Sequence, residues 1–352
     1  ALPWQTRWIA YDPRFHGDIW EYHRVSLYGW DILFAVLVVL YWKELKQGFE
    51  KLVSSQSPAL VAFMVLVTAA FFTGSWARDS SLALYWTSRL LEVGTLVLLV
   101  QVAKPKFTAV CWALAFAGML QAVWALAQFG TQATFANKWL GAAGHPLTLG
   151  GTSVVLTQTG RWLRAYAGQV HPNVLGALLA ITIVATLYLF VARAWKNHSW
   201  LALVLIAVQT MALVVTFSRT AWLAVVLSLV VWWFVAQAEQ RTLVRVATLV
   251  VVVTSVATMF LVRDPVLARV TAQGRLETQS VEERVAATRE SGGILRHTWL
   301  QGVGMGNYTL EVESREPGHR SFYYQPVHNL FLLVFSELGV VGILAFLALL
   351  GF

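Results

Sequence analysis

Long apolar runs separated by polar segments recur along the whole chain. A transmembrane helix needs about 20 predominantly apolar residues. Nine runs come close to that length, at residues 27–42, 58–76, 83–102, 107–129, 173–192, 199–217, 220–236, 243–262 and 327–350. Residues 1–10 resemble the outer end of an earlier span. The pattern predicts an all-α fold, a polytopic transmembrane helical bundle with about ten or more spans.

The apolar stretch at residues 199–236 is interrupted only by Ser218-Arg219-Thr220. One helix of that length would overshoot the bilayer. We therefore predict two helices joined by a tight turn that contains Arg219.

Two long polar segments set the predicted domain organisation. Residues 1–262 form a transmembrane bundle with an outer loop at 130–172. Residues 263–326 form one large loop, and residues 327–352 continue the bundle. Because the chain starts without a methionine and stops inside an apolar run, we expect further segments at both ends.

The large loop is predicted to be partly helical. Ser280 and Glu283 have the spacing of a capping box, and residues 281–291 continue as helix-compatible sequence. The pair Gly292-Gly293 is expected to end this helix.

Charge places the loops on the two sides of the membrane. Only 12% of the residues are charged, about half the fraction found in soluble domains. Lysine and arginine mark the short segments 43–57, 103–106, 193–198 and 237–242 as cytoplasmic, since short cytoplasmic loops are enriched in these residues. Residues 11–26, 77–82, 130–172, 218–220 and 263–326 then lie on the outer side, where most of the arginines fall.

His328 is the first candidate for chemistry. Pro326 fits the start of a helix, which would place His328 in its first turn at the outer surface. The positive end of a helix disfavours imidazolium, so the ring would stay neutral and could act as a base. An interfacial histidine that only binds a loop is the simpler alternative.

Arginines at the outer surface are candidates for binding an anion. A charge held at Arg219 is costly unless it is paired or used, and arginine suits bidentate recognition of phosphate. Snorkelling of Arg219 to lipid head groups is the alternative. Arg164 precedes His171-Pro172-Asn173, an apparent helix start that favours anions. Arg284 follows Glu283 and, taken alone, fits a surface charge.

The remaining motifs are weak or absent, which argues against several kinds of site. Gly302-x-Gly-x-Gly306 could wrap a phosphate with backbone amides, but a tight loop is the favoured interpretation. There is no Asp-x-Asp, no histidine pair at ligand spacing and no Walker loop. No basic helix is suited to nucleic acid. We therefore expect no metal, no cofactor and no nucleic-acid partner.

The C-terminal motifs resemble those of a known family. Gly302-Val-Gly-Met-Gly-Asn-Tyr308, then His328-Asn329, nine residues, Gly339, two residues and Gly342 resemble the signature of the O-antigen ligase and polymerase superfamily. Further resemblances are Ser218-Arg219-Thr220-Ala-Trp222, Val281-Glu-Glu-Arg284, Arg164 with His171-Pro-Asn173, and the opening Leu2-Pro-Trp-Gln-Thr-Arg7. The resemblance covers nearly the whole chain.

The resemblance implies a membrane glycosyltransferase of the GT-C type in the bacterial inner membrane, with its active site facing the periplasm. Such an enzyme moves a glycan from undecaprenyl pyrophosphate to lipid A–core or to another glycan or protein acceptor. It needs no metal and inverts the anomeric centre. His328 would be the catalytic base. The substrate-binding residues would be Arg219, Arg284, Arg164, Asn329 and His171.

Two alternatives remain. A polysaccharide polymerase of the same superfamily shares the donor chemistry, and no short motif separates it from a ligase. A small-anion or inorganic-carbon transporter would place polar or broken helices at the bilayer midplane, often in repeated halves. The polar candidates gather at the outer surface instead and no repeat is visible, which favours the enzyme.

Overall fold

The computed structural model describes residues 5–15, 17–148, 151–158, 160–271 and 275–352, with side chains at all of these except 196, 275–281 and 322. It contains helices and three two-stranded sheets. The chain divides into two compact units. Unit 1 comprises residues 1–7 and 105–278, and unit 2 comprises residues 8–104 and 279–352. These units are defined by contacts between residues, whereas the predicted domains separate membrane-spanning segments from loops, so the predicted domains stay a prediction.

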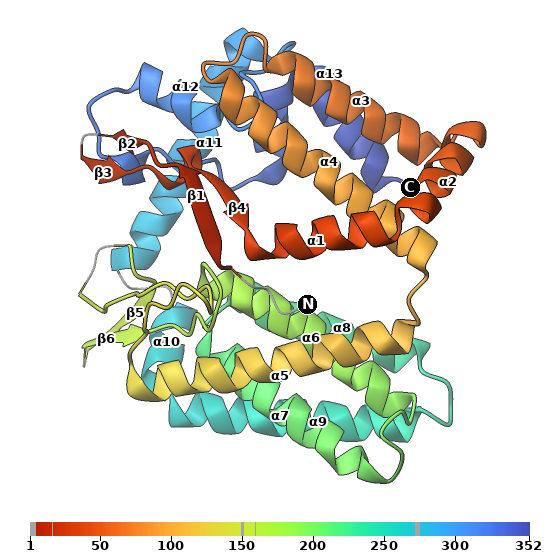
Figure 1. Cartoon of the computed structure of the whole chain (residues 1–352). Coiled ribbons are helices and arrows are strands. Elements are labelled where there is room, and N and C mark those ends of the chain that lie inside the picture. The colour runs from red at the N-terminus through yellow and green to blue at the C-terminus, as the bar shows by residue number, and fades with distance from the viewer. Residues whose placement is uncertain (1–4, 16, 149–150, 159, 272–274) are drawn as a thin grey trace. The chain divides into compact units, whose positions relative to one another are not determined.

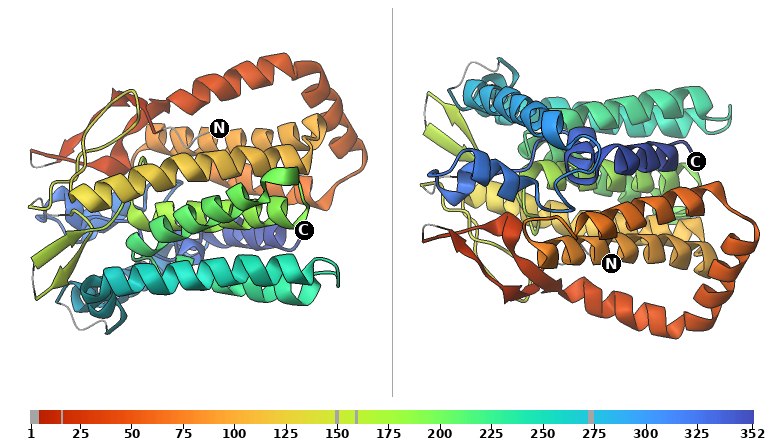
Figure 2. Two further views of the ribbon diagram at one scale, coloured as in Figure 1. Left: turned by 90° about the horizontal axis from the view of Figure 1, so that it is seen from below. Right: turned by 90° about the horizontal axis from the view of Figure 1, so that it is seen from above.

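Unit 1 is a helix bundle with a β-hairpin at one end (Figures 1 and 2). Helices α5, α6 and α7 pack on one another, while α9 packs on α7 and α8 on α6. Buried alanines such as Ala122, Ala125 and Ala202 allow this close approach. The helices are α5 (Phe107–Thr131), α6 (Pro172–Val191), α7 (Ser199–Val215), α8 (Arg219–Val235), α9 (Arg241–Leu261) and α10 (Arg263–Thr271), with a 3-10 turn η2 (Lys196–His198). Strands β5 (Val154–Thr157) and β6 (Gly160–Leu163) are antiparallel, with Val154 opposite Leu163.

Unit 2 combines apolar helices with smaller polar elements. Helix α3 packs on both α13 and α4, and α2 packs on α4 (Figure 1). Its helices are α1 (Gly29–Leu40), α2 (Trp42–Ser54), α3 (Pro58–Thr73), α4 (Ser80–Ala103), most of α11 (Arg275–Thr298), α12 (Tyr308–Arg315) and α13 (Leu330–Leu350). Strand β1 (Arg7–Tyr11) pairs with β4 (Val25–Tyr28), and β2 (Arg14–Phe15) with β3 (Asp18–Ile19). Two 3-10 turns complete it, η1 (Glu21–His23) and η3 (Ser321–Tyr323).

The prediction of a helical membrane protein is confirmed, but the predicted count of ten or more spans is not supported. Among the described residues, five helices are long and apolar enough to cross a membrane, namely α4, α5, α6, α9 and α13. The pair α2 and α3 gives a sixth if the 102° bend between them belongs to one span. Helices α1, α7 and α8 are apolar but have 12, 17 and 17 residues, short of the roughly 20 that a span needs.

Three local predictions were wrong. Residues 43–57 were expected to be a loop, yet most of them form the amphipathic helix α2. Residues 1–10 were expected to end a span, but Arg7 begins strand β1, and residues 1–4 lie outside the described chain. Helix α11 begins at Arg275 and runs through Gly292-Gly293. Ile294, just beyond the glycines, is fully buried in an apolar cluster, and this packing opposes the roughly 1 kcal/mol that each helical glycine costs.

The tight turn between two helices is confirmed. Helix α7 ends at Val215 and α8 begins at Arg219. Arg219 is therefore the first residue of α8, and the turn itself consists of residues 216–218.

Candidate functional site

Three arginines of unit 1 meet at the turn between α7 and α8. Arg164, directly after β6, donates from Nε to the carbonyl oxygen of Thr216 at 2.8 Å. Arg269 on α10 donates from Nε to the carbonyl oxygen of Phe217 at 3.2 Å. Nη1 of Arg219 donates to the carbonyl oxygen of Arg269 at 3.3 Å. We call Arg164, Arg219 and Arg269 the arginine cluster.

The cluster forms here because the end of α7 offers backbone carbonyls. The last carbonyl groups of a helix have no partner within it. Phe217 has a left-handed backbone (φ 50°) that reverses the chain toward α8. The carbonyl oxygens of Thr216 and Phe217 thus become acceptors for guanidinium groups from two distant segments.

Arg164 carries a buried positive charge whose hydrogen-bond acceptors are neutral. It is only 5% exposed, and its Nη2 donates to Oδ1 of Asn173 at 2.6 Å. Burial, followed by the positive charges of Arg269 and Arg219, lowers the pKa of Arg164. An anion bound beside it would relieve both effects.

The first turn of α8 adds to this positive potential. Its N-cap residue, Ser218, makes no side-chain hydrogen bond to the helix, so the first N–H groups are not capped in that way. The N-terminus of a helix favours phosphate. The arrangement can therefore hold a phosphate or pyrophosphate group against Arg219.

His171 links the cluster to α6. It is the N-cap of that helix, and its Nδ1 accepts the backbone N–H of Asn173 at 3.0 Å. Since Nδ1 is an acceptor, the neutral ring carries its proton on Nε2, which lies 2.9 Å from Oγ of Ser153 and donates to it. His171 thereby positions Asn173, the acceptor of Arg164. Its predicted contact with substrate stays a prediction.

His328 and Asn329 lie in unit 2, just before α13. Asn329 is the N-cap of α13, and its Oδ1 accepts the N–H groups of Phe331 at 3.0 Å and Leu332 at 3.2 Å. The helix was expected to begin near Pro326, but asparagine is a strong N-cap and α13 begins at Leu330. His328 is exposed and precedes the helix. The argument that the first turn keeps its ring neutral therefore does not apply.

Arg284 also belongs to unit 2. It lies on α11, where its side chain is exposed and its carbonyl oxygen accepts the hydroxyl of Thr288 at 2.8 Å. Ser280 was expected to cap this helix, but its backbone lies within α11 and its side chain is outside the described part. The structure thus brings Arg164, Arg219 and His171 together in unit 1, while His328, Asn329 and Arg284 belong to unit 2.

The glycine-rich segment 302–306 is a tight structural loop. The N–H groups of Val303 and Gly304 donate to the carbonyl oxygens of Ser336 and Glu337, both at 2.9 Å. These carbonyls are free because Gly339 breaks α13 with φ 66° and ψ −165°. A Cβ atom at Gly302, which has φ +70°, would collide with the carbonyl oxygen of Glu337. The loop therefore clamps α13 at its break, which leaves fewer of its amides for phosphate.

A partly buried ion-pair group accounts for the acids near α4. Arg89 donates to both carboxylate oxygens of Asp31, at 2.7 and 2.8 Å, and to Glu92 at 2.7 Å. This group ties α1 to α4 and gives Glu92 a structural partner, so it does not favour the transporter alternative. Among the described residues, no group of three or more His, Cys, Asp and Glu side chains could hold a metal ion.

Sequence reasoning missed Arg269 and Asn173 as members of the site. Arg269 lies 50 residues from Arg219, and no local spacing connects the two. Asn173 was quoted only as part of a helix start. An arginine excess on the predicted outer side was the one signal that pointed toward Arg269.

Comparison with known proteins supports the motif assignment. Residues 201–347 match the family model described as O-antigen ligase. The matched segment contains Arg219, Arg269, Arg284 and His328, whereas Arg164 and His171 precede it. Neither the curated proteins nor the solved structures gave a match.

Proposed function

We propose, from the premise that the chain belongs to the O-antigen ligase and polymerase superfamily, that it moves a glycan from undecaprenyl pyrophosphate to an acceptor hydroxyl. The family consists of membrane transferases of the ligase or polymerase type that use a lipid-linked glycan donor and a glycan acceptor. We place the reaction at the periplasmic face of the bacterial inner membrane. The single observation that carries the proposal is the arginine cluster, with its buried Arg164, which donates to the neutral oxygens of Thr216 and Asn173.

The arginine cluster would bind the pyrophosphate of the donor. Negative charge grows on the leaving pyrophosphate as its bond to the sugar breaks, and fixed positive groups stabilise it best where water is excluded. Arg164 is buried and Arg219 exposed, so the cluster can reach from the protein interior to a lipid head group. Arg284 would add a further positive charge from the large loop.

His328 would activate the acceptor. Its ring takes the hydroxyl proton while the oxygen attacks the anomeric carbon opposite the pyrophosphate, which inverts that centre. The bond between the anomeric carbon and the phosphate oxygen breaks, undecaprenyl pyrophosphate leaves, and His328 releases the proton to solvent. Histidine suits this role because its pKa lies near neutral pH.

The acceptor distinguishes the two members of the superfamily that fit. A ligase would transfer the glycan to lipid A–core or to another glycan or protein, and a polymerase would transfer it to a second lipid-linked repeat. The donor half of the site is shared, so the same residues serve both.

Transfer from an undecaprenyl-pyrophosphate glycan to candidate acceptors tests the proposal. His328→Ala should lower the rate by about 10²–10⁴-fold, the usual contribution of a general base, while donor binding stays near that of the wild type. His297→Ala is the matched control, because His297 is an exposed histidine on α11, in the large loop that precedes His328. Full activity in His328→Ala would remove His328 from the mechanism.

Arg219→Lys tests the donor half of the site. Lysine keeps the charge but loses the planar pair of donors, so we expect weaker donor binding and slower transfer. Wild-type rates in this variant would contradict the pyrophosphate role.

A further inference from the structure

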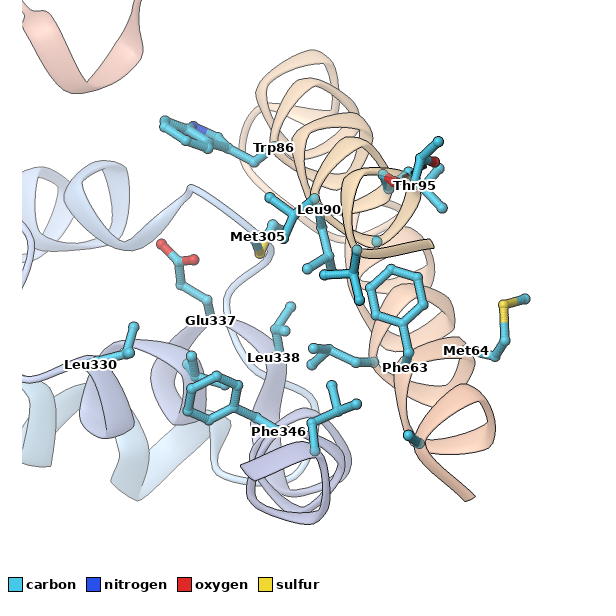
Figure 3. Close-up of a pocket in the computed structure, with 18 of the residues that line it drawn as sticks. Phe63, Met64, Trp86, Leu90, Thr95, Met305, Leu330, Glu337, Leu338 and Phe346 are labelled. Atoms are coloured by element: carbon cyan, nitrogen blue, oxygen red, sulfur yellow. Dashed lines mark hydrogen bonds between the residues drawn. The ribbon is translucent and has the colours of Figure 1, made fainter. Parts of the chain in front are cut away.

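Each unit contains a cavity or pocket, and the two differ in charge. Unit 2 has an apolar cavity of about 970 Å³ between α3, α4 and α13 (Figure 3). No arginine or lysine is found among the described residues that line it. Unit 1 has a smaller pocket of about 220 Å³ at the end of α8, and two arginines belong to its lining. The positive charge makes the pocket of unit 1 a candidate for binding an anion.

This basic pocket lies where α8 is connected to α9. Its lining comes from the last residues of α8, the connection and the first two turns of α9, namely Trp233, Phe234, Ala236, Arg241, Val244 and Arg245. No aspartate or glutamate lines it in the part of the chain that the structure describes. Pockets that enclose a drug-sized ligand have volumes of about 300–1,000 Å³. The basic pocket is smaller, so it fits a head group and not a whole lipid.

The two arginines are placed where positive charge is unfavourable without a counter-ion. Arg241 is the first residue of α9, and the positive end of a helix disfavours a cation. Arg241 and Arg245 are four residues apart, a spacing at which like charges on a helix repel each other. Neither forms an ion pair with a carboxylate of the described residues. An anion bound to both guanidinium groups would relieve both repulsions.

Trp233 helps to orient one of these arginines. Cζ of Arg245 lies 5.5 Å from the centroid of the Trp233 ring, which is a cation–π contact. A guanidinium group held against an aromatic ring still has N–H groups at its edge, and these can bind two oxygens of one phosphate. The basic pocket therefore offers hydrogen-bond donors in a geometry that suits phosphate.

The basic pocket and the arginine cluster lie at opposite ends of α9. Helix α9 has 21 residues and is apolar enough to cross a membrane. At 1.5 Å per residue it is about 31 Å long, close to the roughly 30 Å of a bilayer's hydrocarbon core. Its first residue lines the basic pocket, and α10, which carries Arg269 of the cluster, follows its last residue. The pocket thus belongs to the surface opposite the cluster, and residues 237–242 are a predicted cytoplasmic segment.

The aromatic residues of the basic pocket are typical of the membrane interface. Trp233 and Phe234 are both exposed at the end of the apolar helix α8. Tryptophan is enriched at the level of the lipid head groups. A phosphate held by the two arginines would therefore lie at the same depth as the phosphates of the surrounding lipids.

We propose that the basic pocket binds the phosphate of an anionic phospholipid at the surface opposite the arginine cluster. A phosphate between two guanidinium groups is chemistry that free inorganic phosphate shares. The exposed rings of Trp233 and Phe234 favour the lipid, because they can contact its acyl chains, whereas inorganic phosphate has no apolar part. The protein would hold this lipid without converting it, so the inference does not depend on the proposed glycan transfer.

Native mass spectrometry of the full-length protein tests the site. The protein is purified in detergent, stripped of lipid and titrated with phosphatidylglycerol, phosphatidylethanolamine or inorganic phosphate. The double variant Arg241→Gln/Arg245→Gln removes both charges and keeps the two side chains polar. Arg193→Gln is the matched control, because Arg193 is an exposed arginine in another predicted cytoplasmic segment and does not line the pocket.

We expect phosphatidylglycerol to bind the double variant about 25-fold more weakly than the wild type, or about fivefold for each arginine, the usual effect of one basic residue near an anionic lipid surface. Arg193→Gln should keep the wild-type affinity. Phosphatidylethanolamine should bind the wild type more weakly than phosphatidylglycerol does, because its ammonium group neutralises its phosphate. An excess of inorganic phosphate is needed to displace the lipid if the aromatic rings contribute to binding.

Four results would overturn the proposal. The first is equal affinity of the wild type and the double variant for phosphatidylglycerol. The second is displacement of the lipid by an equal concentration of inorganic phosphate, since the ligand would then be the free ion. The third is equal affinity for phosphatidylethanolamine, and the fourth is an equal loss in Arg193→Gln, which would indicate a general effect of charge.

A second variant covers the case in which the double variant does not fold. Arg241→Lys/Arg245→Lys keeps both charges but loses the planar pair of donors and the contact of a guanidinium with Trp233. Its affinity for phosphatidylglycerol should fall below that of the wild type. An unchanged affinity there would also contradict the proposed site, and thermal unfolding without lipid shows which variants are folded.

Discussion

The arginines of unit 1 differ from surface cations in what they bind. Arg164 and Arg269 donate to backbone carbonyls at the end of α7, and these acceptors carry no full charge. Arg164 therefore keeps most of its positive charge available, and it keeps this charge in a buried place. Burial makes any interaction with an anion stronger than it would be in water.

Inorganic pyrophosphate should stabilise the protein through Arg164. At a concentration of 100 times Kd, a ligand that binds only the folded state adds about 2.7 kcal/mol to the free energy of unfolding. Thermal unfolding in detergent should show this as a rise in Tm. In Arg164→Gln, which keeps a donor for a carbonyl but loses the charge, most of the rise should disappear.

Arg161→Gln is the control for this measurement, since Arg161 is an exposed arginine on the neighbouring strand β6. It should keep the full rise in Tm. An equal rise in wild type and Arg164→Gln would show that pyrophosphate binds elsewhere.

Asn329 has a structural task that can be separated from a role in binding. Its Oδ1 caps α13, and loss of such a cap costs about 1 kcal/mol. Asn329→Asp and Asn329→Ser keep a capping oxygen, whereas Asn329→Ala does not. If Asn329 only caps the helix, transfer activity should recover in the Asp and Ser variants. If its amide N–H group also binds substrate, all three variants should lose donor or acceptor affinity.

Single residues were predictable where the energetic cost of a charge between apolar segments singles them out. Arg219 is recognisable because a charge between two apolar runs must be paired or used. Asn329 was expected to bind substrate, and its capping bonds could not be foreseen while the helix was expected to start at Pro326. Arg269 needed the fold, because its partner Phe217 is 52 residues away.

At the level of elements, backbone hydrogen bonds hold the glycine loop (residues 302–306) and α13 together. The loop's amides bind the two carbonyls that the break at Gly339 frees, and Val340 beyond the break donates to the carbonyl of Trp299 at 2.9 Å. Both sides of the break are therefore held by the same segment. This is why glycines recur in both sequence motifs.

Gly302→Ala should destabilise unit 2. A non-glycine residue in a left-handed conformation costs about 1–3 kcal/mol, and the collision with the Glu337 carbonyl adds to this because backbone cannot move aside easily. A lower Tm and lower yield in the membrane are the expected results.

Gly293→Ala offers a contrast on the same chain. Gly293 lies inside α11 with open space around it, so alanine should stabilise the helix by up to about 1 kcal/mol. Equal stability losses in Gly293→Ala and Gly302→Ala would mean that the left-handed backbone is not the cause.

Apolar elements were easier to predict than polar ones. The tight turn at residues 216–218 follows from a run too long for one span. Helix α11 could not be bounded, because Gly292-Gly293 are a strong local stop signal that burial of Ile294 overrides. Helix α2 was missed because its lysines and glutamates resemble a loop, although they alternate with apolar residues at helical spacing.

For the whole molecule, the sequence leads to a prediction of sidedness but not of assembly. The positive short loops assign a side to every connection, but contacts between segments far apart in the chain decide the units. Unit 2 joins residues 8–104 to residues 279–352, and no local sequence pattern predicts that these two ranges pack together. The apolar cavity between α3, α4 and α13 could not be predicted from the sequence either, since its walls come from both of those ranges.

The predicted sidedness is open to direct measurement. Cys111 is the only cysteine in the chain and is 2% exposed, so it should react little with a membrane-impermeant maleimide. Pro317→Cys, in the predicted outer loop, should be labelled once the reagent reaches the periplasm. Ser55→Cys, in a predicted cytoplasmic segment, should be labelled only after the inner membrane is permeabilised. The reverse pattern would invert the topology.

The number of residues from Asn329 to Gly339 fixes the orientation of His328 relative to the break in α13. The Asn329 cap fixes one end of the first part of α13, and the glycine loop fixes the other end at Gly339. The number of residues between them therefore sets the direction in which the side chain of His328 points relative to the break. Each added residue would turn His328 by about 100° and shift it by about 1.5 Å, with both anchors intact. An inserted alanine should therefore spare folding and abolish transfer, and the spacing in the motif would reflect helical phase more than side-chain chemistry.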